Sequence, residues 1–426
     1  MRKIILRDRR PIRPFNEPAR ELRFLNKPLW LLQKDILAPY VTQEREVDSL
    51  EDIEAERVET LVYRENLFFD EHFIAAFLTK ARRLGKACQV AFPLDDKAIV
   101  NHALPLQRTI RRQGDYYVAD MWYFPYGVEE IIRPLPISTE PREMGYYRVP
   151  THMSDTMGDL VYQVPTRAFM AIESWIHVLL ANVLFGVFAE AARLDRSIDE
   201  SVALQLKLFW RALLEQTQVL SSSAVVKIGQ NCSIDPSVII RGPTVIGDNV
   251  DIGPGAVVDI CVIGNNVTIS DSCHLMLSVV SDRCFLPFRA SLFETVLMED
   301  TMVAQNTCLQ LSCVGRTSFI GAGSTFTDFN LIPKPLRALY GDRLEQTEMT
   351  VLGSCVGHHC RIGSGLIFYP ARTIESDSVL VASNERRVIT KDVTFEESDA
   401  LTIPDAERVH PRLYPRDGKW KMPRPG

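Results

Sequence analysis

The amino-terminal segment lacks the long hydrophobic run of a secretory signal. Its one uninterrupted apolar stretch is Ile4–Leu6, and charged residues return immediately afterwards. A signal peptide needs an apolar core of about 7–15 residues. We therefore expect a cytoplasmic protein.

The nine cysteines lack the paired spacing of a disulfide framework. Their number is odd and they are spread over a long chain, whereas disulfide-bonded domains are small and dense in cysteine. Cys355 and Cys360 flank His358 and His359 in GSCVGHHCRIG, which resembles a zinc-ligand cluster. The repeat described below turns Cys360 inward, so packing is the favoured interpretation of these cysteines.

The chain also lacks an excess of positive charge. It has 48 basic and 54 acidic side chains, a formal net charge of −6 and a pI near 5.8. This balance argues against a dominant nucleic-acid-binding surface, so any polyanion site is expected to be local. A length of 426 residues predicts two or three domains.

A membrane span is not indicated either. The most apolar part of the middle segment, Trp175–Ala189, has 15 residues and contains His177 and Asn182, whereas a span needs about 20. We expect a buried helix, followed by a second one capped by Ser197 and Glu200. This helical hairpin, assigned to residues 161–222, is a candidate oligomer or protein-partner contact, and an interfacial membrane helix is the less favoured alternative.

What the sequence does contain is an apolar residue at every sixth position in the second half. The period is neither 3.6 nor 2, and the phase slips by one residue at intervals, which closes a three-sided turn of 17 or 18 residues. Small or β-branched residues recur four positions after each anchor. The anchors are Ile228, Ile234, Ile240, Ile246, Ile252, Val258, Ile263, Ile269, Leu275, Val280, Leu286, Leu292, Leu297, Val303, Leu309, Val314, Ile320, Phe326, Ile332, Val356, Ile362, Phe368, Ile374 and Leu380.

This period is typical of hexapeptide repeats, which predict a left-handed parallel β-helix over residues 223–392. Three short parallel strands per turn form a triangular prism with the anchors stacked inside. Residues 333–350 interrupt the period and are interpreted as a loop insertion. Beyond the prism, residues 393–426 are rich in proline and basic residues, which predicts an extended tail that could contact a neighbouring subunit or an acidic partner.

Residues 1–160 alternate strand-like runs with helical stretches, which favours an α/β domain. Sugar-1-phosphate nucleotidyltransferases begin with a strand, a glycine-rich loop carrying an arginine, and a Lys-Pro segment. This chain resembles them in Ile4–Leu6 and Lys27-Pro28-Leu29, with Arg13, Arg20 and Arg23 between, but the glycines are missing. Their absence predicts a degenerate phosphate cradle.

A closer resemblance is to the alternative bacterial bifunctional UDP-N-acetylglucosamine pyrophosphorylase/glucosamine-1-phosphate acetyltransferase-like family. It rests on RPFNEPARELR, ENLFFDEHFIAAFL and GAGSTFTD and covers roughly residues 1–100 and 223–392. For the first domain it implies that Arg13, Arg20, Arg23 and Lys27 bind nucleotide and sugar phosphates. Mg²⁺ would then be held by Asp95 and Asp96. The favoured interpretation of these residues is that the basic side chains form surface or interdomain ion pairs and the aspartates a solvated turn.

For the prism, the resemblance implies a homotrimer that binds acyl-CoA between neighbouring prisms and uses a histidine as base. No histidine lies between His274 and His358, and Gln305, Gln310 and Leu311 occupy the expected turn. The candidate bases are therefore His274, His358 and His359, with Lys334 and Arg337 as ligands of a CoA or sugar phosphate. For each histidine, an ordinary surface or satisfied side chain is the favoured interpretation over a base.

Two hypotheses follow. The first is a transferase of sugar-nucleotide metabolism, catalytically impaired or not, that acts on a sugar phosphate or nucleotide with Mg²⁺ and acetyl-CoA or a nucleoside triphosphate. The second is a non-catalytic trimeric scaffold or regulatory subunit that needs no cofactor. A metal site like that of γ-carbonic anhydrases would need three converging histidines and is disfavoured. The sequence leaves open whether the protein is an enzyme.

Overall fold

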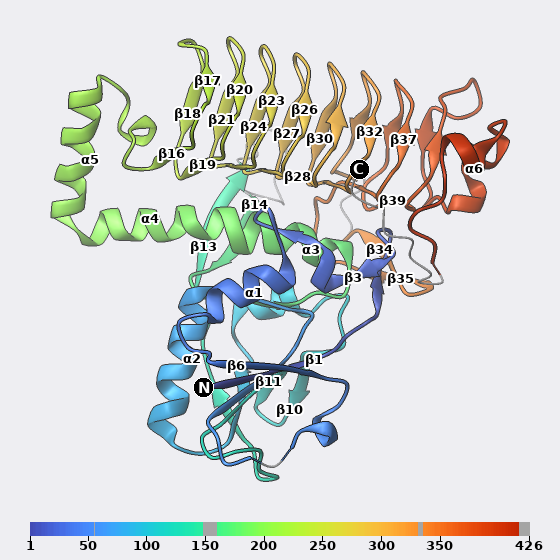
Figure 1. Cartoon of the computed structure of the whole chain (residues 1–426). Coiled ribbons are helices and arrows are strands. Elements are labelled where there is room, and N and C mark those ends of the chain that lie inside the picture. Colours follow the sequence, from blue (N-terminus) through green and yellow to red (C-terminus); the bar gives the residue numbers. More distant parts are fainter. Residues whose placement is uncertain (55, 148–159, 331–334, 417–426) are drawn as a thin grey trace. The chain divides into compact units, whose positions relative to one another are not determined.

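The computed structural model describes residues 1–54, 56–147, 160–330 and 335–416, which form two compact units (Figure 1). The first unit comprises Met1–Arg10 and Pro18–Phe185, and the second comprises Pro11–Glu17 and the chain from Gly186 onward. The domain boundary expected at residue 160 therefore falls inside the first unit. Residues 161–171, expected in the helical hairpin, contain strands instead, and Pro11–Glu17 belongs with the prism.

A mixed β-sheet forms the centre of the first unit, in the strand order β12-β9-β11-β7-β1-β6, with β10 paired to β11. β1 runs parallel to β6 and β7, and β11 runs antiparallel to β7 and β9. This arrangement confirms the expected α/β class. The strands are β1 (Arg2–Leu6), β6 (Gln43–Val47), β7 (Thr60–Arg64), β9 (Cys88–Pro93), β10 (Arg111–Gln113), β11 (Tyr116–Phe124) and β12 (Arg133–Pro136).

Two helices accompany this sheet, α1 (Leu29–Leu37) and α2 (Glu71–Leu84). The Asp70 side chain caps α2 by accepting a hydrogen bond from the Phe73 amide, and Gly85 ends it at φ +63°. The remaining short pairs of the first unit are β8 (Leu67–Phe69) with β15 (Phe169–Ala171), β13 (Pro141–Tyr147) with β14 (Leu160–Pro165), and β4 (Arg23–Phe24) with β5 (Lys27–Pro28).

In the part of the chain that the structure describes, one helix, Trp175–Glu200, is long and apolar enough to cross a membrane. Its most apolar window has a mean hydropathy of 1.7, and 94% of that window is buried inside the protein, as expected for a buried helix. It comprises α3 (Trp175–Asn182), a π-helical turn (Val183–Phe188) and α4 (Ala189–Glu200). The next helix, α5 (Val202–Glu215), is capped by Ser201, whose hydroxyl accepts a hydrogen bond from the Leu204 amide. The predicted cap Ser197 lies inside α4 instead and donates to the Arg193 carbonyl.

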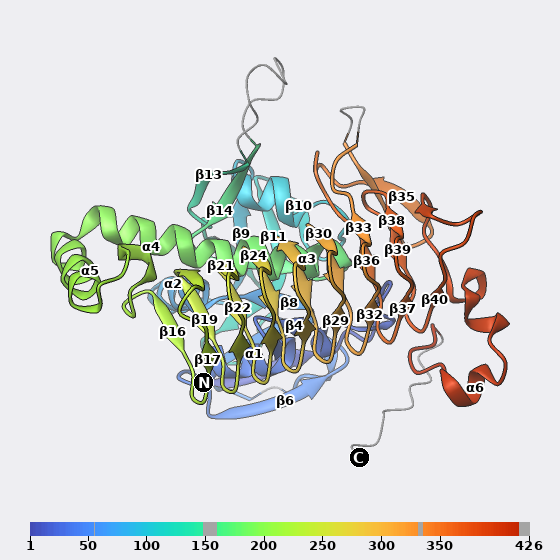
Figure 2. The same cartoon turned by 90° about the horizontal axis from the view of Figure 1, so that it is seen from above.

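Three parallel eight-stranded sheets form the prism (Figures 1 and 2). The first contains β16 (Val226–Ile228), β19 (Thr244–Ile246), β22 (Val262–Ile263), β25 (Val279–Val280), β28 (Val296–Leu297), β31 (Cys313–Val314), β36 (Cys355–Val356) and β39 (Thr373–Ile374). The second contains β17 (Ser233–Ile234), β20 (Asp251–Ile252), β23 (Thr268–Ile269), β26 (Phe285–Leu286), β29 (Met302–Val303), β32 (Phe319–Ile320), β37 (Arg361–Ile362) and β40 (Val379–Leu380). The third contains β18 (Ile239–Arg241), β21 (Val257–Asp259), β24 (His274–Met276), β27 (Ser291–Phe293), β30 (Cys308–Gln310), β33 (Thr325–Phe326), β38 (Ile367–Phe368) and β41 (Val388–Ile389).

The predicted anchors are the core of this left-handed β-helix. From Ile246 to Leu380, every anchor in the described part of the chain belongs to one buried cluster. Ile228, in the first coil, is 49% exposed, and Ile332 lies outside the described residues. Cys273, Cys284 and Cys360 pack in the same cluster, which confirms the packing interpretation. Burial raises the pKa of the Cys284 thiol to about 12, so it stays protonated and unreactive.

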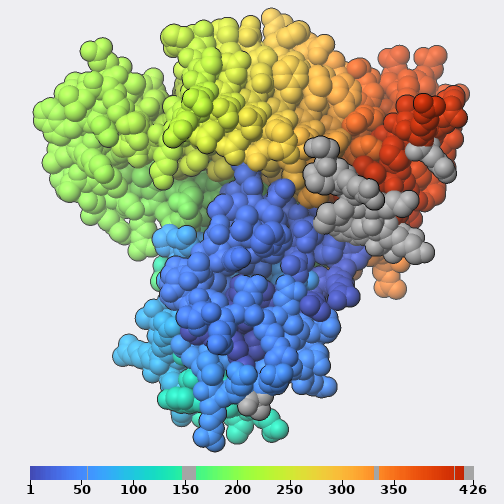
Figure 3. Space-filling model, viewed as in Figure 1, coloured from blue at the N-terminus to red at the C-terminus, as the bar shows by residue number. Residues whose placement is uncertain are grey.

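Short elements lie at both ends of the prism. At the start, Leu208 of α5 packs with Val225 and Val226. At the far end, the 3₁₀ turns Phe395–Glu397 and Asp399–Thr402 and helix α6 (Ala406–Val409) form the red part of Figures 1 and 3. His410 and Tyr414 are buried there. The prediction of an extended tail is therefore wrong up to residue 416, and residues 417–426 lie outside the described chain.

The insertion also has structure of its own. β34 (Arg337–Tyr340) and β35 (Arg343–Gln346) pair antiparallel as a hairpin, with Gly341 at φ +62° in its turn. Its neighbours Phe329 and Val351 form an antiparallel bridge at the base. The period resumes in β36, so the prism accommodates the hairpin between adjacent coils.

Replacing Phe326 with alanine tests the prism core. Phe326 is fully buried, and its ring stacks on Phe368 with centroids 4.2 Å apart. We expect Phe326→Ala to lower the free energy of unfolding of the prism by about 3–5 kcal/mol. The control Phe288→Ala, at a position 48% exposed, should cost far less. Urea denaturation measures both, and equal losses would contradict the inward stacking.

Candidate functional site

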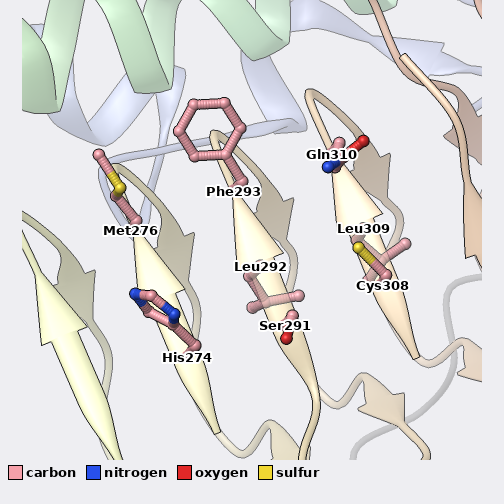
Figure 4. Close-up of a pocket in the computed structure, with 8 residues that line it drawn as sticks. All are labelled: His274, Met276, Ser291, Leu292, Phe293, Cys308, Leu309 and Gln310. Atoms are coloured by element: carbon pink, nitrogen blue, oxygen red, sulfur yellow. The ribbon is translucent and has the colours of Figure 1, made fainter. Parts of the chain in front are cut away.

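One exposed face of the prism carries the first candidate base, His274. The parallel register aligns His274 with Ser291 and Cys308, and aligns Met276 with Phe293 and Gln310. Figure 4 shows these two rows on β24, β27 and β30, with the inward anchors Leu292 and Leu309 between them. These side chains line a shallow pocket of about 130 Å³.

His274 lies beside the apolar side chains that line the pocket. His274 is exposed, and its coil neighbours Ser291 and Cys308 are half-buried. Burial, assisted by the nearby Asp328 carboxylate, raises the pKa of the Cys308 thiol, which keeps it protonated. An accessible imidazole can accept a proton from a bound hydroxyl or amine.

His358 is placed very differently, because it is fully buried. Its Nδ1 accepts a hydrogen bond from the Arg316 amide at 2.9 Å, which leaves the proton on Nε2, 3.0 Å from Glu17 Oε1. The ring packs against Phe15 and Tyr414. Burial lowers the pKa of His358 despite the opposing Glu17 carboxylate. His358 is closed to substrate, which contradicts its candidacy as the base.

Glu17 and Arg316 form a bidentate ion pair beside this ring, with distances of 2.9 and 2.7 Å. Glu299 Oε1 lies 3.2 Å from Arg316 Nε on its other side. Burial opposes ionisation of Glu17, but His358 and Arg316 outweigh it and lower the pKa of Glu17. The cluster fixes segment Pro11–Glu17 to the prism as a buried structural contact.

His359 also has a structural position. It occupies a corner with φ +55°, the conformation that Asn249 and Asn266 adopt in earlier coils. Its Nδ1 is 3.0 Å from Asp377 Oδ1 in the next coil, just as Asn249 Nδ2 donates to Asn266 Oδ1. His359 is 8% exposed and stacks on His410 with ring centroids 4.1 Å apart. It belongs to a corner ladder and does not face the His274 pocket.

Arg20 and Lys27, two of the predicted phosphate ligands, already face carboxylates. Arg20 donates to Glu65 at 2.7 Å, and Lys27 donates to Asp35 at 2.6 Å. Arg23 is half-buried, and its carbonyl accepts from Asn182 Nδ2. The contacts of Arg20 and Lys27 are those expected from the ion-pair interpretation.

The other predicted phosphate ligands belong to the second unit. Arg13 donates to the Gly341 carbonyl and to Asp342 at the tip of the inserted hairpin. Arg337 is exposed on β34, and Lys334 lies outside the described residues. The arginines that were expected to form one cluster are thus divided between the two units.

The predicted magnesium ligands diverge. Asp96 is buried and accepts hydrogen bonds from the Thr139 amide and hydroxyl and from the Ile99 amide, whereas Asp95 is exposed. Both oxygens of Asp96 thus serve an internal loop. Within the described residues no group of three His, Cys, Asp or Glu side chains is arranged to hold a metal ion.

Two sets of residues take part in these arrangements without having been predicted from the sequence. Phe293 could have been found from the 17-residue coil period, because it lies 17 residues after Met276 and stacks on it in the next coil. Glu17 gave no such signal, since its partner Arg316 lies 299 residues away.

Comparison with known proteins agrees with this architecture. Residues 226–259 match the family model for the bacterial transferase hexapeptide (six repeats). The chain is 23% identical over 221 residues to the bifunctional protein GlmU of Pseudoalteromonas atlantica, covering 47% of this chain and 48% of the relative. It is 28% identical over 215 residues to the bifunctional protein GlmU of Geotalea uraniireducens, covering 46% and 41%.

Over just under half of its length the chain is similar to GlmU proteins, and residues 226–259 carry the hexapeptide repeat. The chain spans about half the length of the curated relatives it matches. Among solved structures, the polysialic acid O-acetyltransferase OatWY matches with a TM-score of 0.18 and 18% identity, covering 39% of this chain and 79% of that one.

Substituting Glu17 tests whether the buried cluster is structural. Glu17→Gln removes the negative charge that pairs with the buried Arg316 guanidinium. Because a buried charge without its partner is costly, we expect the free energy of unfolding to fall by about 3–5 kcal/mol. Glu385→Gln, at an exposed position of the same unit, is the matched control. Chemical denaturation compares the two, and an equally stable Glu17 variant would show that the cluster does not hold the segment.

Stability should also fall with acid. Burial lowers the pKa of His102 and of His177 to about 4, below the unfolded value of about 6.5. Unfolded histidines therefore bind protons first. The stability that these neutral rings contribute is complete above about pH 6.5 and is lost as pH falls toward 4, by up to ~1.4 kcal/mol per pH unit for each group.

Urea unfolding at several pH values measures this slope. His102→Gln should flatten it in the first unit, whereas His72→Gln, at an exposed position, should leave it unchanged. Parallel slopes for the wild type and His102→Gln would rule out the neutral buried ring as the cause.

Proposed function

We propose that the prism is an acyltransferase, in which His274 deprotonates the acceptor and the face of β24, β27 and β30 holds the acyl donor. One observation carries this proposal: of the three candidate histidines, His274 is exposed beside an apolar pocket, while His358 and His359 are buried in structural contacts. The donor class is a CoA thioester and the acceptor class is a sugar-related hydroxyl or amine.

The reaction needs only one proton carrier. The acceptor oxygen or nitrogen attacks the thioester carbonyl and gives its proton to His274. The new bond to the acyl carbon forms, the carbon–sulfur bond breaks, and the imidazolium returns the proton to the departing thiolate. Met276 and Phe293 would pack against apolar parts of the substrates.

The pocket is too small to hold the donor alone. Its volume of about 130 Å³ is well below the roughly 300–1,000 Å³ of sites that enclose drug-sized ligands. A second prism packed beside this face would supply the missing wall, so the proposal includes a homotrimer. It does not include nucleotidyl transfer with Mg²⁺, because Arg20 and Lys27 already face carboxylates and Asp96 serves an internal loop. The proposed location is the cytoplasm.

A non-catalytic trimeric scaffold is the second candidate. It is favoured by the structural use of His358 and His359, which shows that histidines in this prism can serve packing alone. Under this interpretation no acyl donor is consumed. Protein partners would then contact other surfaces, such as the exposed apolar side chains of α5.

Release of free CoA thiol from acetyl-CoA tests the proposal, with glucosamine, its 1-phosphate and other amino or hydroxyl sugars as acceptors. His274→Ala should lower the turnover about 10²–10⁴-fold, whereas His72→Ala should not change it. Light scattering on the same samples reports whether both variants remain trimeric. Acceptor-dependent turnover that survives in a folded His274→Ala trimer would exclude His274 as the base. No turnover by a trimeric wild type would favour the scaffold.

A further inference from the structure

The first unit contains a larger hollow that none of the proposed chemistry uses. Its volume is about 420 Å³, within the range of small-molecule sites. It lies against β1 and β6, and α1 and the 3₁₀ turn Ala19–Glu21 contribute further lining residues. All of these belong to one compact unit.

The strand register explains which side chains face this hollow. Alternate residues of a strand point to the same side, so Ile4 enters the core while Lys3 and Ile5 face the hollow. The parallel pairing of β1 with β6 places Glu44 beside Lys3 and Glu46 beside Ile5. Lys3, Glu44 and Glu46 thus place charged groups on the surface of β1 and β6 that lines the hollow.

The charges around the hollow balance. Three cations, Lys3, Arg20 and Lys34, face three carboxylates, Glu21, Glu44 and Glu46. Lys3 is buried and lies 2.7 Å from Glu44, and Arg20 lies 3.4 Å from Glu46. A balanced surface does not attract a polyanion such as a nucleoside triphosphate. It does offer alternating acceptors and donors to neutral hydroxyl groups.

An aromatic ring completes the lining. Trp30 on α1 lines the hollow and is 38% exposed, although large aromatic side chains are usually well buried. Lys34 follows one helical turn later and lies on the same side of α1. The indole presents an apolar surface with a polar edge, next to charged groups that can form hydrogen bonds.

The hollow continues beyond Lys34. A second pocket of about 250 Å³ shares Lys3, Lys34 and Glu44 with the first and extends along Leu37 and Val41. The two together form an elongated groove along the first turns and the end of α1. A ligand longer than one ring can therefore lie in it.

We infer that this groove binds a saccharide. One ring would stack its C–H face on Trp30, its hydroxyls would donate to Glu44 and Glu46, and Lys34 would donate to its oxygens. An uncharged polyhydroxylated ring uses the aromatic surface and both signs of charge, whereas a triphosphate meets three carboxylates. The inference does not require acyl transfer by the prism.

Saturation-transfer NMR on the full chain tests this site with glucose, N-acetylglucosamine and maltose as probes, and with uridine and UTP as comparisons. We expect saccharide signals that weaken about tenfold in apparent affinity in Trp30→Ala, equivalent to ~1.4 kcal/mol. Trp30→Phe should retain most of the binding because a ring remains. Trp210→Ala is the matched control, since Trp210 is an exposed tryptophan on α5.

The outcomes separate this site from the prism. Saccharide binding that persists in His274→Ala and is lost in Trp30→Ala supports the groove whether or not acyl transfer occurs. Binding of uridine or UTP without any saccharide would overturn the assignment in favour of a nucleotide. Absence of signal for all three saccharides, or signals that Trp30→Ala leaves unchanged, would overturn it as well.

Discussion

Closure of each coil is the constraint on which the prism depends. A coil of 17 or 18 residues must place an apolar side chain inside at every sixth position, and from Ile246 to Leu380 the described anchors all do so. Parallel pairing then fixes the position of each outward side chain relative to the coils above and below. Chemistry is thereby confined to outward positions, and their spacing along the prism is set by the repeat.

The end of the prism is held by a different kind of interaction. Glu17 and Arg316 are joined far from each other in the sequence, and their ion pair is satisfied from both sides by His358 and Glu299. Gly357 lies where an added Cβ would be 2.8 Å from the Pro14 carbonyl, so the backbone of Pro11–Glu17 approaches the coil closely. The ion pair favours this one arrangement of the segment. If Glu17 moved away, Arg316 would be left as a buried charge without its partner, which is costly.

The two halves differ in how far the sequence could predict them. The prism was predictable because its repeat is local and its anchors follow a fixed period. The α/β class of the first unit was predictable, but its boundary was not. The predicted boundary at residue 160 falls at the start of β14, which pairs with β13 of the same unit, and Pro11–Glu17 joins the other unit. The tail was misjudged because its composition, rich in proline and basic residues, gave no sign that Tyr414 would be buried against His358.

The candidate histidines show why residue type alone could not identify a site. His274 directly precedes an anchor, so its side chain points outward. His359 stands three residues after an anchor, at a left-handed corner, where Asn249 forms the same kind of contact with the next coil. Position within the repeat thus separates a histidine available for chemistry from one that supports the fold. The same rule applies to the first unit, where strand register, and not the number of arginines, decides which charges face the groove.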